Sequence, residues 1–240
     1  MGTEIDSKAK IISASIQLFS QKGYDATRVS EIAEAAGVAK ALIYYYFRSK
    51  KEILDYLVQN LMNDAASITL DFINVQLNQM LTEKKIAIEN GKLHFADEQA
   101  IQEFMTNINS YHQRIVDFVL TNRQVLRILL TEALKDSKHR QQLFQLTKLT
   151  PLVDKNLILK KALENFPQAE NAALFKLFFF QIPLLGFAAF FDDYKSFSQQ
   201  SEKELRASFL RALQVITISL ITGSKVKPNE GECKNDKNNG

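Results

Sequence analysis

Apolar residues recur every three or four positions along most of the chain, while turn-forming residues are scarce. The 240 residues include only 8 Gly and 4 Pro. Because Gly and Pro are the strongest local interrupters of regular structure, this spacing predicts long helices joined by short connections. With 46% hydrophobic and 24% charged residues, the chain can bury a core like that of an ordinary globular protein. We therefore predict an all-α fold.

The first 51 residues are expected to form three short helices. The first would cover 8–22. Thr27 can cap a second helix over 29–36, and Gly37 supplies the left-handed backbone that ends it. A third helix over 39–47 follows after a gap too short for a loose linker. Two helices joined by so tight a turn are typical of a helix-turn-helix unit.

The third expected helix has two different faces. At about 100° per residue, Ile43 and Phe47 fall together and would face the core. The tyrosines at 44–46 span an arc of about 200° and cannot all be buried. Between positions 35 and 51 there are four cations and no acid. Neutralised phosphates explain this asymmetry, and tyrosine hydroxyls can donate to phosphate oxygens. The alternative is a three-helix packing unit with a solvated basic rim.

The rest of the chain is expected to be helical, with one exception. Ser49 and Glu52 form a capping box that opens a long helix over 52–81, bent near 65–67. Alternating residues around Asn-Gly make a small β-hairpin near 85–95 an alternative to a plain loop. Further helices are expected over 97–120, 123–135, 140–164 (kinked at Pro151), 169–191 and 202–222, before a disordered tail at 225–240.

Several classes of function lack their signatures. The three histidines show no metal-ligand spacing, and no nucleophile or phosphate-loop motif is present, so we expect no enzyme, no metal site and no cofactor. The single cysteine, Cys233, and the absence of a signal-peptide pattern indicate a cytoplasmic protein, associated with the nucleoid if it binds DNA. The apolar stretch 177–191 is short for the roughly 20 residues of a membrane span, so a core or interface helix is expected and no membrane partner.

Residues 8–54 resemble the DNA-binding domain of the TetR (tetracycline-repressor-like) family of bacterial regulators. The resemblance lies in Ile11, Ile12, Ala14, Leu18, Phe19 and Gly23, in "ATRVSEIAEAAGV", and in "LIYYYFRSKKEIL". It covers about 47 residues; the remainder resembles the family only in architecture. It implies a three-helix DNA-binding domain at 1–51, then a helical effector-binding and dimerisation domain of about six helices at 52–224.

By position, the resemblance implies a set of DNA contacts. Phosphate contacts are expected from Thr27, Tyr46 and Lys50, and positions in or beside the major groove from Lys40, Ala41, Leu42, Tyr44 and Tyr45. Three residues depart from the family pattern: Ala39 removes a side-chain cap, Ala41 replaces a frequent Gly, and Leu42 replaces a frequent hydroxyl. We therefore predict thymines beneath Leu42 and a guanine near Lys40.

In the family the last two helices pair with those of a second copy. Candidate residues for a homodimer interface are Phe179, Phe187, Phe190, Phe209, Leu213, Ile216 and Leu220, with an intramolecular core as the alternative. The middle helices would enclose a small hydrophobic or aromatic effector. Candidate lining residues are Phe72, Phe104, Tyr111, His112, Phe118, Phe144 and Phe175, for each of which ordinary core packing is the alternative.

The resemblance thus implies a ligand-responsive regulator of transcription, in the family's usual mode a repressor. A dimer would bind a palindromic double-stranded DNA operator with its two recognition helices about one turn apart. Effector binding would shift the long helix that begins near 52 and change the separation of the two recognition helices. The alternative function is a helical dimeric scaffold or ligand-binding protein that has lost operator binding.

Overall fold

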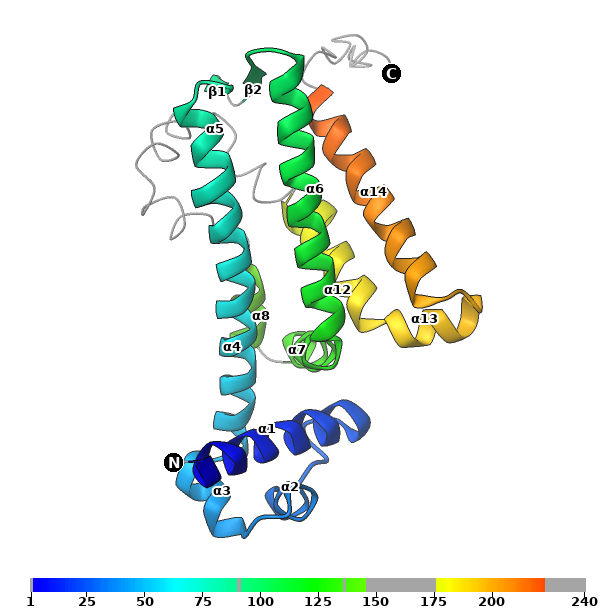
Figure 1. Ribbon diagram of the computed structural model, residues 1–240. Helices are drawn as coiled ribbons and strands as arrows, with labels where there is room; N and C mark the ends of the chain where they lie inside the picture. Colours follow the sequence, from blue (N-terminus) through cyan, green and yellow to red (C-terminus); the bar gives the residue numbers. More distant parts are fainter. Residues whose placement is uncertain (1, 90–91, 136, 146–175, 223–240) are drawn as a thin grey trace, which may run out of the picture.

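The computed structural model describes residues 2–89, 92–135, 137–145 and 176–222, and within them nearly every element is a helix. A small group of helices, α1 to α3, lies at one end of the molecule (Figure 1). Long helices rise from it, and a two-stranded hairpin lies at the opposite end. The predicted all-α fold is confirmed.

The N-terminal group consists of α1 (Gly2–Lys22), α2 (Val29–Ala36) and α3 (Lys40–Tyr46). Gly37 takes the left-handed conformation, with φ 63° and ψ 35°. This conformation lets the Val38 amide donate to the Ala33 carbonyl at 3.0 Å, which closes the turn between α2 and α3. Ala39 precedes α3 without a side-chain cap, as its methyl group requires. The helix-turn-helix therefore forms where the sequence predicts it.

The long helix α4 (Lys50–Asp71) starts after Ser49, the predicted N-cap, but only the Ser49 half of the predicted capping box forms. The Glu52 amide donates to the Ser49 hydroxyl at 3.2 Å, and the Glu52 carboxylate accepts from the Arg48 amide at 2.6 Å. The α-helix is continuous through 65–67, where the sequence predicts a bend. The irregularity comes later, as a π-helical segment η1 (Phe72–Leu77) that leads into α5 (Asn78–Thr82).

The hairpin alternative at 85–95 is confirmed. Strands β1 (Ile86–Glu89) and β2 (Lys92–Phe95) pair antiparallel, with Ile86 opposite Phe95 and Ile88 opposite Leu93. The turn residues 90–91 lie outside the described residues. An isolated hairpin is marginally stable; here its apolar face is covered, because Ile86 is buried in one cluster with Met80 and Phe104.

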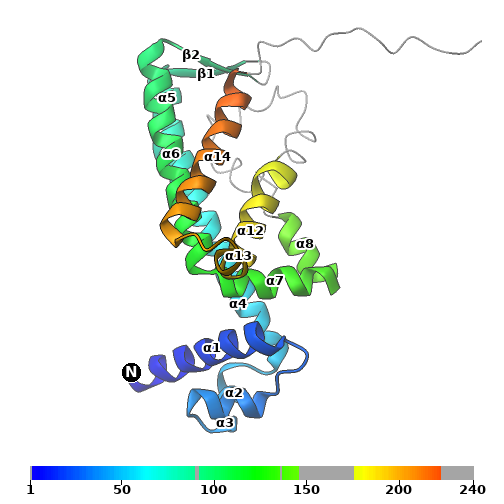
Figure 2. The ribbon, with the colours of Figure 1, turned by 90° about the vertical axis from the view of Figure 1, so that its right-hand side faces the viewer.

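The remaining helices are α6 (Glu98–Thr121), α7 (Arg123–Lys135), α8 (Ser137–Gln145), the π-helical segment η2 (Lys176–Gln181), α12 (Ile182–Ala189), α13 (Phe191–Ser198) and α14 (Glu202–Thr222). Asp97 caps α6, since its carboxylate accepts from the Ala100 amide at 2.7 Å. Figure 2 shows α6 and α14 running side by side.

The helix expected over 169–191 is wrong at its end. Regular helix stops at Ala189, and α13 leaves at an angle of 68° from the Leu177–Ala189 segment. Within the described residues no single helix is long and apolar enough to cross a membrane. Among the described helices only that bent pair, taken together, has the length and apolar composition of a membrane span. The expected Pro151 kink, most of the helix at 140–164 and the tail at 225–240 lie outside the described residues.

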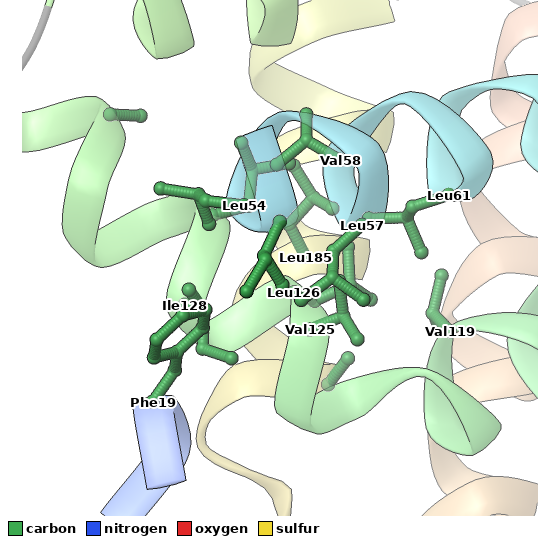
Figure 3. Close-up of a cluster of buried hydrophobic side chains, with 14 of the residues drawn as sticks. Phe19, Leu54, Leu57, Val58, Leu61, Val119, Val125, Leu126, Ile128 and Leu185 are labelled. Carbon is green, nitrogen blue, oxygen red and sulfur yellow. The ribbon is translucent and has the colours of Figure 1, made fainter. Parts of the chain in front are cut away.

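One hydrophobic core connects the two predicted domains. Phe19 of α1 packs in the same cluster as Leu54 and Leu57 of α4 and Ile128 of α7. Figure 3 shows Phe19 beside Ile128, with the α4 residues next to them and Leu185 of α12 behind. Apolar contact therefore continues across the expected boundary at residue 51, and the small domain is packed firmly on the large one.

Candidate nucleic-acid interface

Helix α3 presents aromatic side chains to solvent from a buried base. Ile43 and Phe47 are buried in the main core, as the helical wheel predicts. Tyr44 is 48% exposed and Tyr45 is 71% exposed. Tyr46 is half-buried against the core, and its ring meets that of Tyr45 edge-on at 5.1 Å between centroids. The exposed part of the tyrosine run is therefore Tyr44 and Tyr45.

Exposed cations surround this aromatic surface. Lys40 lies over the ring of Tyr44, with 6.0 Å from its ammonium to the ring centroid. Arg28, Lys40, Arg48 and Lys51 are exposed and have no ion pair within 4 Å in the described part of the chain. Lys10 and Lys22, in contrast, are neutralised by Asp6 and Glu31. The predicted phosphate contacts do not include Arg28. Its position directly before α2 could have marked it as a candidate phosphate contact.

Thr27 differs from its predicted roles. It does not cap α2; the residue at that position is Arg28, whose amide donates to the Glu31 carboxylate at 2.7 Å. Thr27 is 1% exposed, and its hydroxyl donates to the Gly23 carbonyl at 2.8 Å. The hydroxyl is thus already used inside the chain, and this geometry argues against a phosphate contact from the Thr27 side chain.

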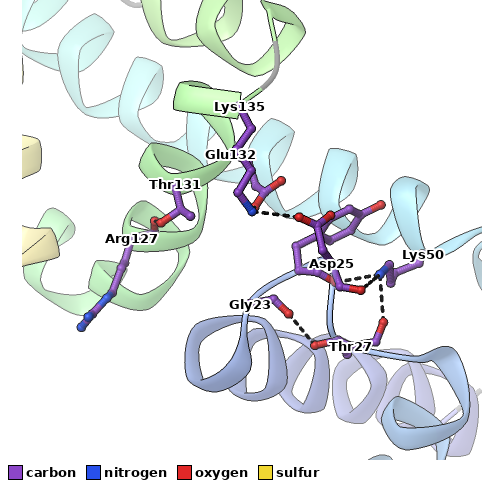
Figure 4. Close-up of polar contacts among 9 residues, drawn as sticks. Gly23, Asp25, Thr27, Lys50, Arg127, Thr131, Glu132 and Lys135 are labelled. Carbon is purple, nitrogen blue, oxygen red and sulfur yellow. Dashed lines mark hydrogen bonds and ion pairs between the residues drawn. The ribbon is translucent and has the colours of Figure 1, made fainter.

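Lys50 also has an internal role that the sequence does not reveal. Its ammonium donates to the carbonyls of Tyr24, Asp25 and Thr27, at 2.7, 3.2 and 2.9 Å (Figure 4). It also lies 4.3 Å from the centroid of the Tyr24 ring. Since an ammonium has three donors, its capacity is filled in this conformation. Lys50 therefore holds the loop between α1 and α2, and the predicted phosphate contact would compete with that role.

The same loop is held from the large domain. The Asp25 carboxylate accepts from the Lys135 ammonium at 2.9 Å, and Lys135 also pairs with the buried Glu132 at 3.0 Å. These partners raise the pKa of Lys135, the hydrogen bond that it donates to Asp25 being the larger cause. Burial, and then the charge of Glu132, raises the pKa of Tyr24. The loop before α2 is thus fixed by α4 on one side and by α7 on the other.

Three of the predicted effector residues come together. Phe72 and Tyr111 lie 4.8 Å apart between ring centroids, and Tyr111 lies 5.9 Å from His112. Phe180, which the sequence does not single out, lies 5.8 Å from His112.

The other effector candidates lie elsewhere. Phe104 is buried against Phe95 in the hairpin cluster, because β2 folds back over α6. Phe118 packs against the main core, and Phe144 is exposed on α8, so it does not line an enclosed space. Phe175 lies outside the described residues.

The residues predicted for the homodimer interface also differ: some are exposed and others are packed within the chain. Phe179 and Phe190 are exposed, and Ile216 is half-buried. Phe187 stacks on Phe209 at 4.0 Å between centroids, so these two rings join α12 to α14 within the chain. Leu213 is 2% exposed and already belongs to the core of the single chain, which corrects its prediction as an interface residue. The side chain of Leu220 lies outside the described part.

The family model described as "Bacterial regulatory proteins, tetR family" matches residues 11–57, from α1 into α4. The biofilm operon icaADBC negative transcriptional regulator IcaR of Staphylococcus aureus (strain Newman) is 48% identical over 52 residues, which are 22% of this chain and 28% of that relative. The Staphylococcus epidermidis IcaR is 43% identical over 56 residues, 23% of this chain and 30% of that relative. The matched segment therefore spans less than a third of these curated relatives.

Solved structures share the whole architecture. A transcriptional regulator from Aquifex aeolicus matches with a TM-score of 0.56 and 19% identity, over 88% of this chain and 99% of that one. The fatty acid degradation regulator FadR from Bacillus halodurans matches with a TM-score of 0.53 and 18% identity, over 92% and 97%. At these identities the likeness establishes the fold. The matched family and relatives are regulators of transcription, and none of them is an enzyme.

Proposed function

We propose that this chain, which belongs to the TetR family by its N-terminal domain, is a repressor that binds a palindromic DNA operator as a homodimer and is released by a small effector. The observation that carries the proposal is α3. Ile43 and Phe47 fix the helix to the core, while Tyr44 and Tyr45 are exposed. Two adjacent exposed phenol rings beside Lys40 form a surface suited to the major groove and its phosphates.

The surface around α3 supplies the charge for phosphates. Arg48 and Lys51 follow the helix, and Arg28 precedes α2. Each is exposed and without an ion pair among the described residues, so each can neutralise a phosphate without first breaking a contact. Lys40, Ala41 and Leu42 would approach the bases, with guanine opposite Lys40 and thymine methyl groups under Leu42.

A homodimer would use the apolar surface that α12 and α14 leave exposed. Phe178 on η2 and Ile182 at the start of α12 are exposed, as are Phe190 after α12 and Val215 on α14. The stacked pair Phe187 and Phe209 holds the two helices together beneath them. A two-fold axis along this surface would set two α3 helices about 34–36 Å apart, one turn of DNA.

Release by an effector would act through the loop between α1 and α2. Lys50 at the start of α4 and Lys135 at the end of α7 both bind this loop. Movement of either helix in the large domain would therefore shift Asp25 and, with it, α2 and α3. An effector can drive this only if it binds the two arrangements with different affinities.

Selection from random double-stranded DNA, followed by fluorescence anisotropy at several salt concentrations, tests the proposal. We expect a palindrome with two half-sites about 10 base pairs apart. Lys51→Ala should weaken binding to all sequences and reduce the salt slope by about 1 for each subunit, or about 2 for the dimer. Leu42→Thr should change the base preferred at one step in each half-site.

Lys203→Ala is the matched control, because Lys203 is an exposed lysine on α14, far from α3. It should leave the salt slope unchanged. Failure to select any sequence, with a stable dimer in solution, would favour the alternative of a scaffold or ligand-binding protein without an operator. A selected operator bound by monomers would contradict the dimer.

A further inference from the structure

Aromatic rings from three separate elements meet inside the large domain. Phe72 comes from η1, Tyr111 and His112 from α6, and Phe180 from η2. Tyr111 and Phe180 are almost parallel, at 13°, but their centroids are 6.4 Å apart, whereas Phe187 and Phe209 stack at 4.0 Å. The Tyr111 and Phe180 rings are thus not in close face-to-face contact, unlike the pair that joins α12 to α14.

Both π-helical segments of the described chain contribute to this cluster. Phe72 is the first residue of η1, and Phe180 is near the end of η2. A π-helical turn costs regular hydrogen bonding, and such turns occur frequently at functional sites. The two segments lie far apart in the sequence and meet at the same rings. This coincidence singles out the cluster among the aromatic contacts of the molecule.

Buried polar atoms without partners lie on the same elements. The His112 side chain is 3% exposed, and its Nδ1 has no hydrogen-bond partner. Asn109 Oδ1, about one turn earlier on α6, and Gln76 Oε1, about one turn after Phe72, are also buried and unpaired. Native proteins pair most buried polar atoms, so three unpaired atoms on the segments that carry Phe72, Tyr111 and His112 indicate a missing partner. Two of the three are amide oxygens, which accept hydrogen bonds.

Within the described residues, no cation lies over any of the four rings. The ion pair of Arg114 with Asp71, near Tyr111 and Phe72 in the sequence, is exposed and neutralised internally. Burial lowers the pKa of His112 to about 4, and no neighbouring charge contributes to this shift. The imidazole is therefore neutral at pH 7, and an ionised ligand would find no counter-charge to offset its loss of water. Apolar rings with a few acceptors suit a molecule that is mostly hydrophobic and donates hydrogen bonds.

We propose that Phe72, Tyr111, His112 and Phe180 form the binding site for a neutral, largely aromatic molecule with a hydroxyl or N–H donor, and that the site rejects carboxylates of the same shape. This inference rests on the proposed function, in which such a molecule is the effector. We assign specificity to His112, because its Nδ1 is buried and unpaired, whereas the Tyr111 hydroxyl already lies 3.4 Å from the Thr69 hydroxyl.

Calorimetric titration of the full chain with three naphthalene derivatives tests the proposal. The probes share one ring system: 2-naphthol has a donor, 2-methoxynaphthalene has none, and 2-naphthoate is an anion. We expect 2-naphthol to bind about 10-fold tighter than 2-methoxynaphthalene, the value of one net hydrogen bond, and 2-naphthoate to bind most weakly. No binding of any probe, equal affinity for the first two, or tightest binding of 2-naphthoate would overturn the proposal.

Two variants separate ligand recognition from packing. His112→Phe keeps an aromatic ring and should reduce the preference for 2-naphthol to less than about 2-fold. Asn109→Leu is a second variant that removes one acceptor should His112→Phe fail to fold. Phe104→Leu, in the hairpin cluster, is the control and should keep the full preference. A preference that survives in both site variants contradicts the assignment.

DNA binding of the same proteins keeps the two proposals distinct. If the unliganded wild-type chain binds no operator, the repressor proposal is refuted and the ligand-site proposal is unaffected. Operator binding without any probe binding would refute the ligand site alone. If both hold, 2-naphthol should lower operator affinity in the wild-type chain, and His112→Phe should need a higher 2-naphthol concentration for the same effect.

Discussion

Buried polar groups are treated differently in the helix-turn-helix and in the middle helices. In the helix-turn-helix domain, the Ser15 hydroxyl donates to the Ile11 carbonyl at 2.7 Å and the Thr27 hydroxyl to the Gly23 carbonyl at 2.8 Å. On α6, Asn109 Oδ1 and His112 Nδ1 have no partner in the described structure. The first arrangement fixes a backbone shape, whereas the second leaves hydrogen-bonding capacity for another molecule.

The largest expected effect tests whether these two regions share one core. Leu57 of α4 is buried between α1 and the large domain. Leu57→Ala should lower the free energy of unfolding by about 2–5 kcal/mol, and both regions should unfold in one transition. Urea unfolding followed by circular dichroism and by hydrogen exchange of α3 measures this. Separate transitions for α3 and α6 would mean that the regions differ because they are independent.

The second prediction concerns how Lys50 fixes the loop before α2. Lys50→Met keeps the apolar stem but removes three charged hydrogen bonds to carbonyls. We expect a loss of about 1.5–3 kcal/mol in stability. Lys51→Met, at the adjacent exposed lysine, should change stability by less than about 0.5 kcal/mol. Equal effects on stability from both variants would show that Lys50 is a surface residue like its neighbour.

The third prediction uses pH to probe the middle helices. Burial lowers the pKa of His112 to about 4 from the ordinary 6.5, so between these values the unfolded chain binds the proton more readily. Stability should therefore fall as the pH drops from 6.5 towards 4, by on the order of 2 kcal/mol at pH 5. In His112→Phe this component should be absent. An identical loss between pH 7 and pH 5 in wild type and variant would contradict the depressed pKa.

The smallest effect, about 1 kcal/mol in each direction, comes from replacing one polar group in each region. Thr27→Val removes a satisfied hydroxyl and should destabilise the chain. His112→Phe at pH 7 removes an unsatisfied group and should stabilise it. Thermal unfolding measured side by side gives the two signs. The same sign for both variants would remove the contrast between the regions.

The helix-turn-helix could be predicted from sequence because its signals are local. Gly37 marks the turn, Ser49 and Glu52 mark the start of α4, and the spacing of Ile43 and Phe47 marks the buried face of α3. The hydrogen bonds of the Lys50 ammonium could not be predicted. Its three carbonyl partners lie 23 to 26 residues earlier, and only the folded chain brings them close to it.

The large domain is less predictable for a physical reason. The helix α12 is apolar nearly all round, which gives no preference for one face. The sequence therefore cannot tell that Leu185 points inward while Ile182 is exposed. The π-helical segments η1 and η2 depend on tertiary packing and leave no periodic signal. No sequence pattern therefore predicts that the Phe180 ring lies beside those of Tyr111 and His112.

The hairpin at the far end of the molecule gives α4 the mechanics of a lever. The cluster of Met80, Ile86 and Phe104 anchors α5 to β1 and α6, and the π-helical segment η1 lies directly between this anchor and the 22 residues of α4. A helix of that length spans about 33 Å, so a tilt of about 5° at η1 would displace its other end by about 3 Å. That other end carries Lys50, which holds the loop before α2. A tilt too small to disturb the rings near Phe72 would therefore be enough, in the proposed complex, to move α3 away from its half-site on the DNA.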